Sequence, residues 1–345
     1  MDFPFVSIII PCRNEEGFIG KCLSSVTIQD YPQDKIEVLI VDGMSEDGTR
    51  EIIGRYIKKN TGIRMLDNPD KVVPNALNIG IKNAQGEVII RIDAHSIYEK
   101  DYISKCVKYL SEYNADNVGG IWITLPASDG IMARSIALSL SHSFGVGNAY
   151  FRIGSTKPRY VDTVPFGCYK KEVFKRIGLF DEDLIRNQDD EFNLRLIKNG
   201  GKILLVPEIV SYYYARDSLS KLSKMYFQYG YFKPLVALKI GAVLTWRQLI
   251  PVFFVGSLII FFSLSLIFKP FLWLLVLVLS FYIVANLYFS LQIAFRKGLK
   301  YLPVLPIVFS TLHFSYGVGY LKGIWDFVVL KKYKRKNIEE VPLTR

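Results

Sequence analysis

The sequence of 345 residues predicts an α/β domain with a mostly parallel sheet, followed by a helical membrane region. Two observations lead to this division. Short apolar segments alternate with amphipathic helical segments through residues 1–217, as they do where helices join parallel strands. Apolar residues then concentrate after Pro251, in stretches long enough to span a bilayer. A chain of this length can hold one sizeable α/β domain and a smaller second unit.

The elements of the α/β domain follow one another closely along the chain. Runs of β-branched residues that end at Pro, Gly or Asp predict strands over residues 6–11, 36–41, 63–66, 87–92, 119–123 and 202–206. Helical spacing of apolar residues predicts helices over residues 15–28, 75–84, 100–113 and 189–198, with another opening at 47–49 and Asn187 as a candidate cap of the last. Residues 126–165 show no firm period, so we expect a mobile substrate loop there.

The C-terminal part is predicted to contain a surface helix and a spanning hairpin. Residues 218–248 are expected at the bilayer surface, because the stretch before Pro234 mixes lysines with apolar side chains. Residues 249–330 form the expected membrane region, with spans over 251–268 and 271–294 around a Lys-Pro turn.

A third apolar segment, 301–329, admits two interpretations. It contains His313 and glycines at 317, 319 and 323, and it either spans the bilayer or re-enters it. One more span would place the basic tail, 331–345, outside the cell, against the positive-inside bias. A re-entrant segment would avoid this conflict.

The charged residues divide at the same place as the apolar ones. Residues 1–217 hold 27 Lys and Arg against 29 Asp and Glu, whereas residues 218–345 hold 16 against 3. Lys and Arg beside apolar segments follow the positive-inside bias and attract anionic headgroups. The net charge of +11 therefore needs no nucleic acid as a partner.

The cysteines and the N-terminal residues indicate a cytosolic first domain. The four cysteines, at 12, 22, 106 and 168, lack metal-ligand spacing, so we expect reduced structural thiols. The chain reaches an apolar strand within a few residues, without a basic segment before it, so no signal peptide is expected. We therefore expect a multi-pass protein of the plasma (inner) membrane whose α/β domain is cytoplasmic.

Two predicted strands end in acidic residues. Asp93-Ala94-His95 follows the strand over 87–92, and Asp42 follows the strand over 36–41. Ligands of open α/β sheets bind beyond the carboxyl ends of the strands, so these acids are expected to face one crevice.

Five segments together resemble the family-2 glycosyltransferases, which are inverting enzymes with the GT-A fold. They are VSIIIPCRNEE (6–16), VDGMSEDGT (41–49), ALNIG (76–80), IDAH (92–95) and QDDE (188–191), in family order and at family spacing. The resemblance covers roughly residues 4–235 and implies a Rossmann-like, mostly parallel sheet flanked by helices. The nearest branch is that of the bacterial succinoglycan and other exopolysaccharide-type glucosyltransferases, where DAH replaces the usual DxD motif.

By this resemblance, Asp93 and His95 bind the nucleotide-sugar through a divalent cation. The family's DxD motif has its second acid as a metal ligand, and His95 stands in that place here. A cation that bridges the phosphate oxygens neutralises the charge that grows as the sugar leaves. Imidazole suits Mn²⁺ better than Mg²⁺, so we expect Mn²⁺ before Mg²⁺. The alternative is that His95 is a surface loop residue and Asp93 a cap.

The resemblance also implies contacts with the donor. Asp42 would contact the base and Glu15 the nucleoside, beside the loop that Pro11 begins, while Lys71 and Asn78 match positions near the donor. A carboxylate that accepts the uracil N3–H is chemically reasonable. Alternatively, Asp42 belongs only to a turn, and Lys71 is a solvated surface lysine.

Inverting transfer needs a base that takes the proton of the acceptor hydroxyl. Asp189 matches the family's base motif, with Gln188 in place of the usual Glu, and lies on the inward stripe of its predicted helix. Asp190 and Glu191 are the rivals. The simpler alternative is a cluster of acids favoured by the helix dipole.

The acceptor side is carried by weaker matches. Gln228, Lys224 and Lys233 occupy the place where relatives carry a Gln/Arg/Trp-type motif that touches the acceptor or the diphosphate. The Arg-Trp pair of that motif is absent. The two lysines would then bind carrier phosphates, or, as the favoured alternative, face lipid headgroups.

The combined interpretation is transfer of a hexose-type sugar, glucose first, from a UDP-sugar to a hydroxyl of a lipid-linked saccharide in cell-surface polysaccharide synthesis. One alternative is a polyprenyl-phosphate glycosyl transferase that uses a UDP- or GDP-sugar; its acceptor is already ionised and needs no base. An alternative from another class is a non-catalytic, membrane-anchored sugar-binding or scaffold protein.

Overall fold

A computed structural model describes residues 3–242 and 245–334, and these residues form two compact units. The first unit comprises Met1–Ile123 and Tyr150–Tyr214, and the second comprises Thr124–Ala149 and Ala215–Arg345. The chain therefore leaves the first unit after residue 123 and re-enters it at residue 150. Most of the predicted tail, 335–345, lies outside the described residues.

Four parallel strands form one half of the sheet in the first unit. They are β1 (Val6–Cys12), β2 (Ile36–Asp42), β3 (Ile63–Asp67) and β4 (Val88–Arg91), in the order β3-β2-β1-β4. β1 and β2 are buried throughout, as expected for central strands covered on both faces. The predicted strands over these segments are confirmed to within one or two residues.

The other half of the sheet is largely antiparallel, so the sheet is mixed and the expectation of a mostly parallel sheet was wrong. Its strands are β5 (Ser96–Tyr98), β6 (Asn117–Leu125), β7 (Arg159–Tyr160), β8 (Cys168–Lys170) and β9 (Ile203–Tyr214). β8 pairs antiparallel with β4 and β6, and β9 pairs antiparallel with β5 and β7. Three of these strands have only two or three residues, too few to show a period of two in the sequence.

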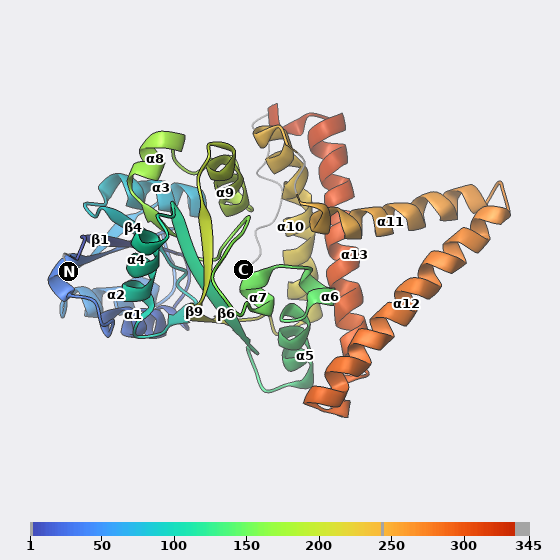
Figure 1. Ribbon diagram of the computed structural model, residues 1–345, viewed down its shortest axis with the longest axis horizontal. Coiled ribbons are helices and arrows are strands. Elements are labelled where there is room, and N and C mark those ends of the chain that lie inside the picture. The colour runs from blue at the N-terminus through green and yellow to red at the C-terminus, as the bar shows by residue number, and fades with distance from the viewer. Residues whose placement is uncertain (1–2, 243–244, 335–345) are drawn as a thin grey trace. The chain divides into compact units, whose positions relative to one another are not determined.

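Helices cover both faces of the sheet. Because successive residues of a strand point to opposite faces, neighbouring residues of β1 pack against different helices. Ile8 and Ile10 pack in a cluster with α1 (Ile19–Thr27), α2 (Thr49–Ile57) and α4 (Tyr102–Glu112). Ile9, between them, packs in a second cluster with α3 (Val73–Asn83), α8 (Glu172–Ile177) and α9 (Gln188–Lys198). Figure 1 shows this layered unit with β6 and β9 crossing in front. α9 begins where predicted, but its N-cap Asn187 makes no side-chain cap hydrogen bond.

The second unit is helical. It contains α5 (Ile131–Leu140), α6 (Ser143–Val146), α10 (Leu219–Ile240), α11 (Trp246–Ser265), α12 (Pro270–Lys297), α13 (Leu305–Gly323) and a π-helical segment (Ile324–Val329). The stretch expected to be a mobile loop thus holds α5 and α6 in this unit, and α7 (Tyr150–Ile153) in the first. Short apolar helices such as α5 carry too few periods to be separated from loop in the sequence.

α10 and α13 pack closely through glycines. A Cβ on Gly319 would lie 2.2 Å from the Phe227 carbonyl oxygen, and one on Gly323 would lie 2.1 Å from the Tyr231 carbonyl oxygen. In return, a Cβ on Gly230 would lie 2.1 Å from the Tyr316 carbonyl oxygen. Small residues let two helix backbones approach in this way. The glycines of the third apolar segment therefore serve a helix–helix contact.

This contact explains two departures from the predicted surface helix. α10 does not end before Pro234 but continues to Ile240, since its packing on α13 supports the turn that lacks a backbone N–H. Lys233 is only 5% exposed, so the expectation that its side chain faces lipid headgroups was wrong. Gln228 is also buried, at 3% exposed, whereas Lys224 is exposed.

α11 and α12 carry the apolar sequence. Among the described residues they are the two helices that are long and apolar enough to cross a membrane, a test of length and composition alone. Figure 1 shows them converging at the short turn that joins them, close to the predicted hairpin. α13 is not selected by this test, so the structure lends no support to a third span.

Candidate active site

The predicted acids lie at the carboxyl edge of the parallel strands. Asp42 ends β2, and Asp93 to His95 form the turn that follows β4, with β1 lying between these two strands. Because β1, β2 and β4 are parallel, their carboxyl ends share one edge. This is the edge at which open α/β sheets bind ligands.

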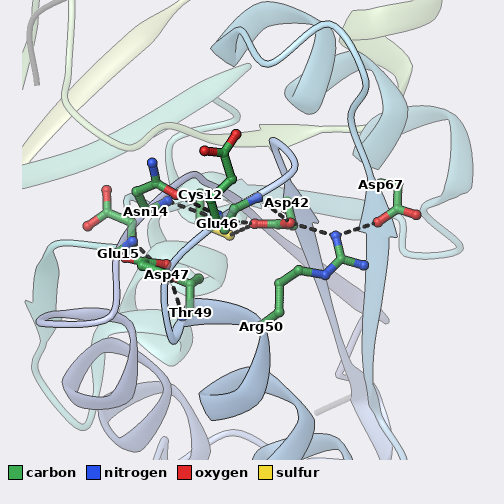
Figure 2. Close-up of polar contacts among 10 residues, drawn as sticks. Cys12, Asn14, Glu15, Asp42, Glu46, Asp47, Thr49, Arg50 and Asp67 are labelled. Atoms are coloured by element: carbon green, nitrogen blue, oxygen red, sulfur yellow. Dashed lines mark hydrogen bonds and ion pairs between the residues drawn. The ribbon is translucent and has the colours of Figure 1, made fainter.

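Two loops at this edge are tied into one piece. The Asn14 backbone N–H donates to Ser45 Oγ (2.8 Å), and Asn14 Oδ1 accepts from the Glu46 backbone N–H (2.9 Å). The Glu15 N–H donates to Thr49 Oγ1 at 2.6 Å. Figure 2 shows these contacts joining the loop after β1 to the loop after β2. The sequence motifs PCRNEE and DGMSEDGT therefore form one preorganised surface.

Asp42 lies beneath the two joined loops and is fully buried. Its carboxylate accepts from Arg50 Nη1 (2.7 Å), from the Ser45 N–H and hydroxyl, and from the Cys12 thiol (3.7 Å). Burial, and then the nearby Asp42 charge, raises the pKa of Cys12, so this thiol stays neutral. Arg50 also contacts Asp67 at 2.9 Å. The nucleobase of a bound nucleotide-sugar would have to replace one of these hydrogen-bond donors to reach Asp42.

Arg91, the last residue of β4, joins two of the predicted site residues. Its Nη2 lies 3.2 Å from Asp93 Oδ1, and its Nη1 lies 3.4 Å from Asp189 Oδ2, in the first turn of α9. Burial lowers the pKa of Arg91, but the charges of Asp93 and Asp189 more than offset it, and the pKa ends above its ordinary value. One permanent cation thus holds both acids. The signal for Arg91 was a charged residue that follows the apolar run 88–90 inside the predicted strand.

His95 lies beside Glu15. Its Nδ1 is 3.5 Å from Glu15 Oε1 and, within the described part of the chain, has no hydrogen-bond partner although it is buried. The ring of His95 is also 6.0 Å from that of Tyr213. The structure therefore brings together four predicted residues, which are Glu15, Asp93, His95 and Asp189.

The donor atoms present fit a divalent cation held by few protein ligands. In residues 3–242 and 245–334 no group of three or more His, Cys, Asp or Glu side chains surrounds a metal position. Asp93 and His95 supply one carboxylate and one imidazole, with side chains 22% and 27% exposed. Mn²⁺ and Mg²⁺ sites at phosphates commonly use one or two protein ligands and take the rest from phosphate and water.

The remaining donor candidates lie near this edge with other partners. Lys71 has a left-handed backbone (φ 63°), and its Nζ lies 4.0 Å from Glu46 Oε1. Asn78 is buried and uses its whole amide on the turn that precedes α9, donating to the Phe180 carbonyl (2.9 Å) and to Glu182 (2.8 Å). To contact the nucleotide-sugar, Asn78 would have to give up one of these hydrogen bonds. Pro11 is buried within β1.

The rivals of Asp189 differ from it in their partners. Glu191 is 5% exposed at its side chain and forms a two-contact ion pair with Arg195, at 2.8 Å each. Asp189 is 37% exposed at its side chain. Glu191 is therefore committed to structure, whereas Asp189 is accessible.

A curled mixed sheet with acids at the carboxyl edge of its parallel strands is the GT-A-like fold of glycosyltransferases. This chain belongs to glycosyl transferase family 2, whose sequence profile matches residues 7–178. The resemblance drawn from the five sequence segments is thereby confirmed.

Two relatives match almost the whole chain. A dolichyl N-acetyl-α-D-glucosaminyl phosphate 3-β-D-2,3-diacetamido-2,3-dideoxy-β-D-glucuronosyltransferase of Methanococcus voltae is 33% identical, over 93% of this chain and 97% of its own. The succinoglycan biosynthesis protein ExoA of Rhizobium meliloti is 28% identical, over 93% of this chain and 95% of its own.

A solved structure has the same fold. The mannosyltransferase PcManGT of Pyrobaculum calidifontis, in complex with GDP-Man and Mn²⁺, aligns with a TM-score of 0.59 at 18% identity. The alignment covers 94% of this chain and 88% of that one.

Proposed function

We propose that this chain is an inverting glycosyltransferase that moves a hexose-type sugar from a UDP-sugar to a hydroxyl of a lipid-linked saccharide. The observation that supports this best is the guanidinium of Arg91, which contacts both Asp93 and Asp189. The reaction needs a cation site for the departing diphosphate and a base for the attacking hydroxyl. The two acids on Arg91 are suited to these two tasks.

The donor side of the site is assigned to Asp93, His95 and Glu15. Asp93 and His95 would hold Mn²⁺ or Mg²⁺, which when bound acts as a Lewis acid on the diphosphate. Glu15, in the surface that joins the two loops, would contact the nucleoside. The Mn²⁺ in the nucleotide-sugar complex of PcManGT, which shares the fold, is in line with this choice.

The base is assigned to Asp189. One oxygen of its carboxylate lies near Arg91, and the other accepts the Asp190 N–H at 3.0 Å. An accessible carboxylate held in this way can take a proton from an acceptor hydroxyl.

The acceptor is proposed to be lipid-linked and the site to lie at the cytoplasmic face of the plasma membrane. The names of the two relatives describe a dolichyl-phosphate-linked acceptor and a polysaccharide pathway. α11 and α12 expose large apolar side chains, among them Trp246 (78%), Trp273 (74%) and Phe281 (69%). Exposed apolar surface of this extent is expected to meet lipid or protein. We assign it to the bilayer.

The polyprenyl-phosphate alternative is less well supported. An acceptor phosphate is already ionised, so the enzyme would gain nothing from an accessible carboxylate at position 189. The scaffold alternative has no use for two acids on one buried cation.

The test is nucleotide binding followed by transfer, on the full chain in detergent. Calorimetric titration with UDP and with GDP, with and without Mn²⁺, is expected to show metal-dependent binding of UDP. A screen of radiolabelled nucleotide-sugars against membrane lipid extracts is then expected to label a lipid. If neither nucleotide binds, the enzyme assignment fails; if only GDP binds, the donor assignment fails.

A further inference from the structure

Arg152 lies in an aromatic cluster close to the proposed site. It belongs to α7, and its guanidinium carbon is 4.6 Å from the centre of the Trp122 ring, 5.4 Å from that of Phe151 and 5.5 Å from that of Tyr213. All four residues belong to the first unit. Cation–π contacts of this kind fix the plane of a guanidinium.

The cluster itself is held by ring packing. Trp122 of β6 stacks on Tyr213 of β9, with centroids 4.6 Å apart and planes 10° apart. Trp122 and Phe151 form an edge-to-face pair with centroids 5.1 Å apart, and Trp122 also packs on Phe166, at 5.2 Å. Arg152 therefore rests on a rigid platform.

The aromatic rings cover the guanidinium, but they leave the N–H groups of its Nη1 without a hydrogen-bond acceptor. Arg152 is 9% exposed, and its Nη1 is buried without a hydrogen-bond partner in the described residues. The Trp122 Nε1–H is buried without a partner as well. A guanidinium carries five donors, and an unpaired buried charge is costly.

Arg91 provides the comparison. It is equally buried, at 9% exposed, yet it has two carboxylates within 3.4 Å. No Asp or Glu among the described residues comes within 4.0 Å of Arg152 as an ion-pair partner. Arginine is the residue that binds planar anions through two parallel N–H groups. The missing partner of Arg152 is thus expected to be an anion that residues 3–242 and 245–334 do not supply, and a bound ligand can provide it.

The cluster adjoins the candidate metal ligand. The Tyr213 ring, which stacks on Trp122, lies 6.0 Å from the His95 ring. Arg152 therefore lies one ring stack away from the place assigned to the donor diphosphate.

We propose that Arg152 and Trp122 form a subsite for the carboxylate of an acidic sugar. This inference rests on the proposed function and narrows one of its two sugars, the donor sugar or the terminal sugar of the acceptor, to a uronic acid. The carboxylate would accept from Arg152 Nη1 and from the Trp122 indole N–H. Either the donor sugar or the terminal sugar of the acceptor can carry it.

The experiment compares acidic and neutral ligands on the full chain in detergent with Mn²⁺. The donor arm measures Kd for UDP-glucuronate and UDP-glucose. The acceptor arm measures Kd for methyl β-D-glucuronide and methyl β-D-glucoside in the presence of UDP, with inorganic phosphate as a competitor. The variants are Arg152→Gln, which removes the charge, and Arg152→Lys, which keeps the charge but loses the planar guanidinium that places Nη1 beside the Trp122 indole N–H. Arg159→Gln is the matched control, since Arg159 is exposed and lies over the Tyr150 ring at 3.6 Å.

The expected result is a loss of about tenfold or more in affinity for the acidic ligand of one arm in Arg152→Gln. The neutral ligand should change less than about twofold, and Arg152→Lys should fall between. The thermal midpoint of Arg152→Gln without ligand should not fall, because the variant removes an unpaired charge. The arm that responds identifies which sugar carries the carboxylate.

Three results would overturn the proposal. The first is that wild type and Arg152→Gln show the same ratio of affinities for acidic and neutral ligands while UDP still binds. That result leaves the proposed function standing. The second is competition by phosphate alone, without any preference for acidic sugars. The third is failure of wild type to bind any nucleotide, which removes both the subsite and the proposed function.

Discussion

Arg91 Nη1 lies 3.4 Å from Asp189 Oδ2, although the two residues are 98 positions apart in the chain. The same guanidinium contacts Asp93 at 3.2 Å, so the end of β4 and the start of α9 meet at one charge. This contact joins the acid assigned to the metal and the acid assigned as base.

Replacement of Arg91 by Met is expected to destabilise the first unit by roughly 2 kcal/mol. This is less than the loss for a fully buried pair, because the Asp189 side chain is 37% exposed. Transfer should fall together with stability, and Arg91→Lys should recover part of both. Thermal unfolding and transfer assays measure this. The control is Arg55→Met, whose exposed pair with Glu51 should contribute under about 0.5 kcal/mol. Equal losses in the two Met variants would show that Arg91 has no special role.

Asp189→Asn is expected to lower the turnover number about 10²–10⁴-fold, the usual range for loss of a general base. Donor Kd should stay within about twofold, because the donor contacts are assigned to other residues. Steady-state kinetics and calorimetry on the same preparation separate the two effects. Asp190→Asn is the matched control; if it alone abolishes transfer, the base is Asp190.

His95→Ala is expected to weaken Mn²⁺ binding in the presence of UDP by roughly tenfold or more, since an imidazole ligand is lost. Mg²⁺ binding should change less, because Mg²⁺ prefers oxygen ligands. Metal titration monitored by calorimetry tests this without any turnover. Unchanged Mn²⁺ affinity would remove His95 from the site and leave Asp93 as the remaining protein ligand.

Gly319→Ala is expected to destabilise the second unit by about 1–3 kcal/mol, the range for overpacking. The new Cβ would lie 2.2 Å from the Phe227 carbonyl oxygen, so α10 and α13 must separate. Gly256→Ala in α11 is the control, because a Cβ there meets nothing within 4 Å, and it should be neutral or slightly stabilising. Thermal unfolding in detergent measures both. Equal midpoints would mean that the two helices can move apart freely.

Protonation of Glu37 in acid should lower the free energy of unfolding of the first unit. Burial alone would raise the pKa of Glu37, but bonds from Ser7 Oγ (2.6 Å), the Gln85 N–H (2.6 Å) and Arg64 (2.8 Å) bring it below the ordinary 4.5. The contribution of Glu37 is therefore complete above pH 4.5 and is lost as pH falls through the lower, folded-state pKa.

Glu37→Gln should lower the free energy of unfolding at pH 7 by about 1–3 kcal/mol and flatten its acid dependence. Denaturant titrations between pH 3 and pH 7 provide the test. Glu51→Gln, at an exposed site, should leave the curve as in wild type. A Glu37→Gln curve parallel to wild type would assign the acid dependence to other groups.

The sequence by itself determined the elements that show a full period and the motifs that lie within one turn. β1 to β4, α1 to α4 and the apolar helices α11 and α12 lie close to where periodicity and turn residues predict them. The DAH triplet lies at a strand end as predicted, and the five segments identified the family. Such features depend on neighbouring residues, which a single sequence displays directly.

Only the tertiary structure decided which distant residues meet. The short strands β5, β7 and β8 exist because longer strands pair with them, and α5 belongs to the second unit because α13 packs against it. Likewise, Arg91 contacts Asp189 and Arg152 stacks on Trp122 through the path of the chain. Pairing and packing of this kind depend on the whole fold, and a local pattern of side chains carries no record of the partner across the sheet.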